Sequence, residues 1–231
     1  MDPYNVSAPH APKTEQDIRL DPCSTPASIE ARSFAIIDAE VGESKPFAGK
    51  AWIVARRLVH TTGDVSLLND LWLPDQAIEA GLNALRQGAP VFTDTEMVRS
   101  GIPLRRLTPL GVNVTCILDR PELAREAAAR GVTRARAGME ALGARLGGSI
   151  VAIGNAPTAL LALLDSIAAG APAPALVIGM PVGFVNAAES KELLLHHRDI
   201  PSLCVRGRRG GSPLAAATVN ALAQILLDER K

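Results

Sequence analysis

Residues 149–158, Ser-Ile-Val-Ala-Ile-Gly-Asn-Ala-Pro-Thr, combine a fully apolar run with a turn and the start of a helix. The apolar run predicts a strand buried on both faces, and Pro157 suits the first turn of a helix. Four similar apolar segments occur elsewhere, at 90–93, 113–118, 175–178 and 201–205. Continuous apolar strands separated by helical stretches are typical of a parallel sheet covered on both faces. We therefore expect a three-layer α/β/α fold with a mainly parallel five-stranded sheet.

The N-terminal part has a different character. Residues 1–25 are rich in Pro, Ser, Asp and Asn, so we expect a flexible tail. The helices expected beyond it are 26–40, 47–62 and 75–87, packed alongside the sheet, with a closing helix that starts near Pro213. Gly63 and Gly88 supply the usual helix stops. We expect residues 26–231 to form a single domain.

Composition excludes several classes of function. The 24 basic and 24 acidic residues cancel, whereas nucleic-acid binding needs a basic excess, so no nucleic acid is expected as a partner. No segment reaches the roughly 18 apolar residues of a membrane span, and no signal peptide is visible. The unpaired spacing of Cys23, Cys116 and Cys204 suits a reducing cytoplasm. Nineteen of the basic residues are arginine, which suits either a GC-rich genome or a ligand with many carboxylates.

Common cofactor and nucleophile motifs are absent from the sequence. No strand is followed by G-x-G-x-x-G, and neither a phosphate-binding G-x-x-x-x-G-K-[ST] nor a G-x-S-x-G elbow occurs. His196 and His197 are adjacent, so on a helix their side chains would point apart rather than bind one metal ion. We expect no metal and no cofactor.

Polar groups and glycines follow the predicted strands, and parallel sheets bind ligands at the carboxyl ends of their strands. The backbone N–H groups of the turn at 154–158 could bind a carboxylate at a helix N-terminus. The candidate substrate-binding residues in the three loops are Gly154, Asn155, Ala156 and Thr158, then Gly179, Pro181, Val182 and Gly183, then Arg206 and Arg208. Tight turn geometry or solvated arginines would explain the same patterns without a ligand.

Four segments together resemble one known family. They are Arg32–Ile37 with Glu40, Val59–Asp64, Val151–Leu160, and Gly179–Val185 continued by Ala188–Lys191. In this order they resemble the precorrin-8X methylmutase family of cobalamin biosynthesis. The resemblance implies a flavodoxin-like fold, a homodimer, and an isomerase that moves a methyl group from C11 to C12 of a corrin precursor, giving hydrogenobyrinic acid. A hand-over of this product to the next enzyme of the pathway is a further possible partnership.

The resemblance also implies roles for individual residues. His60 matches the catalytic histidine, while Ser33 and Arg134, in the pair Thr133-Arg134, are expected to contact substrate. Histidine is the natural acid near neutral pH, and the end of a helix favours its charged form. Position alone would favour a His60 that only caps helix carbonyls, and the resemblance to the family reverses this preference. Pro103 departs from the family pattern, which can carry a threonine there.

Three other functions remain open at this point. The substrate could be the cobalt-containing form of the same precursor, because any cobalt would arrive inside the ring. The protein could also be a non-catalytic corrinoid carrier, or act on another polycarboxylate. No residue in the sequence separates these possibilities.

Overall fold

The structure, a computed structural model, describes residues 25–230, so the predicted tail falls almost entirely outside the described residues. The helices are α1 (Pro26–Val41), α2 (Gly49–Thr62), α3 (Asp75–Arg86), α4 (Glu96–Ser100), α5 (Leu104–Leu107), α6 (Leu123–Ala129), α7 (Arg134–Glu140), α8 (Pro157–Ala168), α9 (Ala187–His196) and α10 (Ser212–Glu229). Within 25–230, no helix has both the length and the apolar character needed to cross a bilayer.

Six strands form one sheet in the order β1-β6-β5-β4-β2-β3. They are β1 (Leu71–Trp72), β2 (Val91–Thr93), β3 (Val114–Cys116), β4 (Ile150–Ile153), β5 (Leu176–Gly179) and β6 (Ser202–Val205). Strands β2 to β6 are parallel, and β1 pairs antiparallel to β6. The predicted mixed α/β class is confirmed, and the five predicted strands are present and parallel. The predicted total of five strands is wrong, because the sheet has a sixth, antiparallel strand. Strand β1 was missed because two residues are too few to show a periodic pattern.

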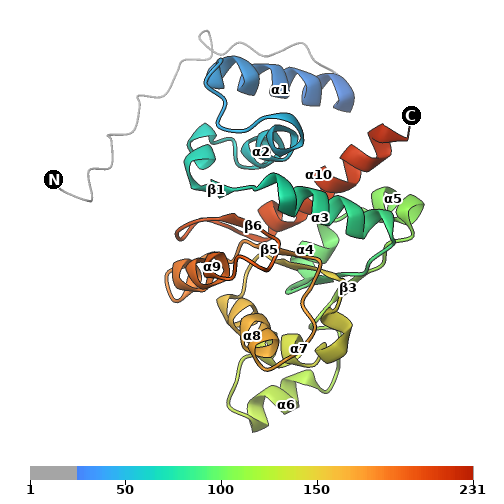
Figure 1. Cartoon of the computed structure of the whole chain (residues 1–231), viewed down its shortest axis with the longest axis vertical. Coiled ribbons are helices and arrows are strands. Elements are labelled where there is room, and N and C mark those ends of the chain that lie inside the picture. Colours follow the sequence, from blue (N-terminus) through green and yellow to red (C-terminus); the bar gives the residue numbers. More distant parts are fainter. Residues whose placement is uncertain (1–24, 231) are drawn as a thin grey trace, which may run out of the picture.

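Helices cover both faces of the sheet. On β4, Ile150 and Ala152 belong to the core shared with α2, α3 and α10, while Val151 and Ile153 pack in the core shared with α7, α8 and α9. Figure 1 shows the first group of helices above the strands and the second below them. The N-terminal helices pack alongside as expected, with α1 lying against the outer side of α2.

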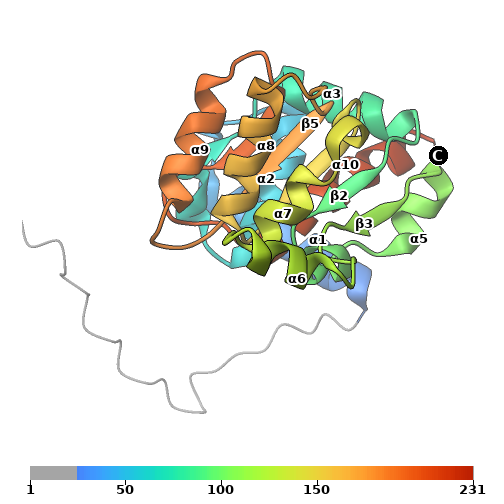
Figure 2. The same ribbon diagram turned by 90° about the horizontal axis from the view of Figure 1, so that it is seen from below.

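The parallel strands all end at one edge of the sheet, which we call the carboxyl edge. Figure 2 shows α7 and α8 in front of the strands when the molecule is seen from below, with α9 beside α8. The antiparallel β1 brings the segment that follows α2 to the same edge, because the Arg206 N–H donates to the Asp70 carbonyl at 2.7 Å. The edge therefore combines the loops after the parallel strands with the segment that follows His60.

Candidate active site

His60 lies in the last turn of α2, where it is half-buried. Its ring packs edge-on against Phe34 of α1, with 5.5 Å between ring centroids. Two local signals fix these helices. A capping box between Thr25 and Ser28 begins α1, and Gly63, with a left-handed φ of 65°, ends α2 as predicted.

The imidazole of His60 is oriented by a second side chain. Its Nδ1 lies 2.8 Å from the Ser33 hydroxyl. The Thr61 and Thr62 hydroxyls and the Gly63 N–H donate to the carbonyls of Arg57, Leu58 and Val59, whereas the imidazole makes no hydrogen bond to a carbonyl of α2. The alternative in which His60 only caps the helix is therefore wrong. Within residues 25–230 the Nε2 atom has no hydrogen-bond partner, and it remains for a ligand.

His60 lines an open pocket of about 310 Å³ between α2, α5 and the first turns of α10. The other lining residues are Arg57, Thr61, Gly101, Arg106, Pro213, Ala216, Ala217 and Asn220. Three small side chains of α10 give this pocket an apolar wall, and its polar groups come from α2, from α5 and from Asn220 of α10. A flat ligand with acidic arms suits such a surface, because apolar contact and fixed cations recognise different parts of it.

The two arginines of this pocket differ in their partners. Arg57 pairs with Glu30 at 2.6 Å and stacks on Phe34, and this hydrogen bond is the main reason that the pKa of Glu30 is lowered. Arg106 is half-buried, and its guanidinium makes no hydrogen bond or ion pair within residues 25–230. Burial, followed by the charge of Arg57, lowers its pKa. Arg106 is thus a partly desolvated cation that senses the charge of Glu30 but has no carboxylate bonded to it within the described residues.

Neither arginine was identified from the sequence. Arg57 precedes His60 by three residues, and helical spacing places such a pair on one face, so a signal existed. Arg106 had none, because only the fold brings α5 to the pocket that α2 lines. Pro103 lies just before α5, where it forms the N-cap position of the helix that carries Arg106.

The turn after β4 is organised by a buried carboxylate. Asp94, at the end of β2, accepts hydrogen bonds from the N–H groups of Gly154, Asn155 and Ala156 at 2.7–2.9 Å. Burial raises the pKa of Asp94, although these three donors act in the opposite direction. The expectation that these amides receive a substrate carboxylate is wrong, because an anion of the protein itself occupies them. Gly154 is needed for packing, since a Cβ would lie 2.6 Å from the Ser212 Cα.

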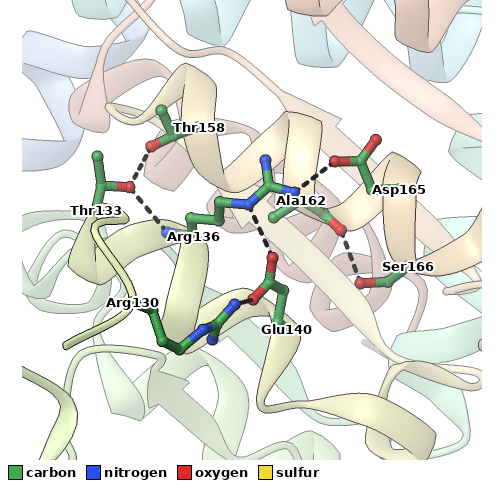
Figure 3. A network of polar contacts seen from close by, with 8 residues as sticks. All are labelled: Arg130, Thr133, Arg136, Glu140, Thr158, Ala162, Asp165 and Ser166. Carbon is green, nitrogen blue, oxygen red and sulfur yellow. Dashed lines mark hydrogen bonds and ion pairs between the residues drawn. The ribbon is translucent and has the colours of Figure 1, made fainter. Parts of the chain in front are cut away.

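Arg134 and Thr158 lie at the carboxyl edge on the lower side of the sheet. The Thr158 hydroxyl lies 2.8 Å from that of Thr133, and this contact joins the N-termini of α7 and α8 (Figure 3). The nearby Arg136 is fully engaged by Glu140 and Asp165. Arg134 is exposed and has no ion pair within the described part of the chain. It remains available to an acidic ligand.

The loop after β5 has a buried beginning and an exposed tip. Gly179 packs closely, because a Cβ there would lie 2.6 Å from Leu194 Cδ2 and would displace that side chain. Pro181 is buried, Val182 is exposed, and Gly183 has a φ of 134° that disfavours any other residue. At the tip Phe184 is 82% exposed, so this loop presents apolar surface at the carboxyl edge.

The three arginines after β6 do not behave alike. Arg206 and Arg208 are exposed and lie over the rings of Trp72 and Phe184. Arg209 pairs with Asp64 and Asp70 in the segment after α2. The first two therefore remain candidates for a substrate carboxylate, whereas the third joins two parts of the protein.

One group of side chains within residues 25–230 has the composition of a metal site. Glu96, Cys116 and Asp119 have ligand atoms within 4.8 Å of one another. The Glu96 carboxylate, however, is bound by the Arg99 guanidinium, and burial raises the pKa of the Cys116 thiol. A competing cation and a protonated thiol both disfavour metal binding.

An α/β domain with an oriented histidine in a cationic pocket near the carboxyl edge of its sheet defines an enzyme for an anionic small molecule. Residues 28–225 match the family model described as Precorrin-8X methylmutase. The chain is 44% identical over 198 residues to Precorrin-8X methylmutase of Sinorhizobium sp, covering 85% of this chain and 93% of that protein. It is 38% identical over 211 residues to Cobalt-precorrin-8 methylmutase of Leptospira interrogans, covering 88% and 94%.

A solved structure of a precorrin-8x methyl mutase from Thermus thermophilus superposes with a TM-score of 0.79 at 40% identity, covering 87% of this chain and 98% of that one. The chain belongs to the precorrin-8X methylmutase family, and it is an isomerase of cobalamin biosynthesis. The family suggested by the sequence motifs is confirmed.

Proposed function

We propose that this protein moves the methyl group from C11 to C12 of precorrin-8X, giving hydrogenobyrinic acid, with His60 as the acid. The observation that supports it best is the His60 imidazole, which Ser33 engages through Nδ1 while Nε2 is left at a pocket with Arg57 and Arg106. The migration adds and removes no atoms, so it needs no hydride or nucleophile. A proton or strong hydrogen bond to a ring nitrogen would shift the electron distribution that permits it.

The remaining substrate contacts are proposed to follow the carboxyl edge. Arg106 is the first candidate for an acidic side arm, and Arg134, Arg206 and Arg208 are candidates for others. The macrocycle would contact Asn155, Thr158, Val182 and Gly183. Ser33 orients His60 and is also proposed to contact the substrate. Gly154, Ala156, Gly179 and Pro181 shape the loops from their buried positions.

The fold is proposed to be a flavodoxin-like arrangement in one domain, 26–231. The order of its parallel strands, β3-β2-β4-β5-β6, supports this assignment, with β1 as an added antiparallel edge. A homodimer is also proposed, because a pocket of about 310 Å³ is at the small end for ligand sites and a second copy could extend it. The free thiols of Cys116 and Cys204 support a cytoplasmic location.

Conversion by the purified protein tests the proposal. Mixing it with precorrin-8X should change the absorption spectrum to that of hydrogenobyrinic acid, without any added cofactor. A spectrum that shifts on binding yet never reaches that of the product would favour the corrinoid carrier instead. Parallel assays with the cobalt-containing precursor decide between the two substrates, and this alternative is kept because relatives carry both names. Retained product that is released only on adding the next enzyme would support a hand-over.

A further inference from the structure

Lys191 of α9 has a fully buried side chain, which is unusual because a buried charge is costly unless it is paired. Its Nζ donates to the carbonyl of Pro181 at 3.0 Å and to the carbonyl of Arg209 at 2.6 Å. No carboxylate is bonded to it within residues 25–230, and burial lowers its pKa. The fold therefore buries an ammonium group, at a cost in desolvation free energy, where its hydrogen-bond partners are two backbone carbonyls.

These two carbonyls belong to different loops, residues 179–183 after β5 and 206–211 after β6, which we call the paired loops. The Gly211 N–H donates to Met180 O at 2.9 Å, and the Gly183 N–H donates to Arg208 O at 3.2 Å. The loops also touch directly, because a Cβ at Gly210 would clash with the carbonyls of Met180 and Pro181. Lys191 thus lies beneath a seam at which several carbonyl oxygens converge.

The paired loops are in turn connected to the segment after His60. The Arg209 side chain pairs with Asp64 and Asp70, while the Arg209 carbonyl accepts from Lys191. Arg209 therefore connects the Lys191 ammonium, in the lower layer, with the segment that follows α2. Movement at Lys191 would reach both the tips of the paired loops and this connection.

We infer that Lys191 is a positioning residue for substrate: its ammonium fixes the paired loops in the arrangement in which Val182, Gly183 and Arg208 meet the macrocycle. The inference rests on the proposed function, because that function assigns these loops to the substrate. Lys191 itself is completely buried, so it would act on the substrate only through the paired loops. Its removal should therefore weaken binding more than it slows the chemical step.

The test is Lys191→Met, which keeps the length of the side chain and removes its charge and donors. The dissociation constant of hydrogenobyrinic acid should rise by about tenfold or more, because the site must be ordered on binding. The single-turnover rate at saturating precorrin-8X should stay within about threefold of wild type, which is the pattern for lost binding without lost acid catalysis. Hydrogen exchange should quicken in residues 179–183 and 206–211. Lys191→Gln, which retains a neutral donor, should recover part of the affinity.

Leu146→Ala is the matched control, since it removes buried packing near the start of β4, at the opposite edge of the sheet. It should lower the melting temperature and leave product affinity unchanged. Wild-type affinity in Lys191→Met, or unchanged exchange in the paired loops, would overturn the inference. Absence of product binding by the wild-type protein would instead reject the proposed function, and the exchange measurement would still report whether Lys191 orders the loops.

Discussion

The His60 pocket and the turn after β4 both have distinctive sequences, but they differ in whether their polar groups have hydrogen-bond partners within the protein. In the turn, the three N–H groups of 154–156 all donate to Asp94. In the pocket, Nε2 of His60 and the guanidinium of Arg106 have no partner within the described residues. Unmet polar groups beside a pocket favour a ligand, whereas satisfied ones favour a structural role.

The difference shows that a carboxylate site at a helix N-terminus can be filled by the protein itself rather than by a substrate. A helix N-terminus with three convergent N–H groups does bind a carboxylate, as the sequence suggested. The carboxylate comes from Asp94, 60 residues earlier in the chain, on the neighbouring strand. Substitutions in the two regions should therefore separate catalysis and binding from stability.

The largest effect is expected at His60. His60→Asn removes the proposed acid, so methyl migration should slow by about 10²–10⁴-fold, the usual contribution of a well-placed acid. Product affinity should stay within about threefold, because the arginines that would bind its acidic arms are retained. The measurement is a single-turnover spectrum with precorrin-8X. His196→Asn, an exposed histidine on α9, is the control. Full turnover by His60→Asn would remove the acid from the mechanism.

The sequence alone predicted the features of the two regions that depend on local pattern. Five parallel strands followed from continuous apolar runs, and Gly63 was identified as a helix stop. What failed depends on tertiary contact. The role of Asp94 gave no local signal, because its carboxyl group accepts from a turn that lies 60 residues later in the chain. Arg106 gave no signal, because the approach of α5 to α2 is set by packing across the domain.

A smaller effect, on stability, is expected at Asp94. Asp94→Asn replaces one acceptor oxygen with an NH2 group, which cannot accept a hydrogen bond from the backbone N–H groups that face it. The free energy of unfolding should therefore fall by about 2–4 kcal/mol. Product affinity of the folded protein should change by less than about threefold, because Asp94 is completely buried. Urea unfolding and spectral titration measure the two quantities. Asp75→Asn, in the exposed first turn of α3, should cost under about 1 kcal/mol. A binding defect without destabilisation would show that the turn does meet the ligand.

The opposite signature is expected at Arg106. Arg106→Gln should weaken binding of hydrogenobyrinic acid by about 10–100-fold, since a hydrogen bond to a charged group contributes about 1.5–3 kcal/mol. Stability should change by less than about 0.5 kcal/mol, because the described residues offer this side chain no ion pair to lose. Arg105→Gln, its exposed neighbour on α5, is the control. Equal losses in both variants would indicate general charge attraction rather than a specific contact.

The smallest effect concerns Cys204 on β6, whose buried thiol has a pKa raised to about 12. The unfolded thiol ionises near pH 9 while the folded thiol keeps its proton, so ionisation favours the unfolded chain as pH rises. Between pH 8 and pH 10 this one group should lower the free energy of unfolding by about 1.4 kcal/mol. Cys204→Ala should lack that loss in urea titrations at the two pH values, whereas Ser149→Ala should keep it. An alkaline loss of equal size in Cys204→Ala would mean that the thiol ionises in the folded protein, and that water reaches the strand beneath the paired loops.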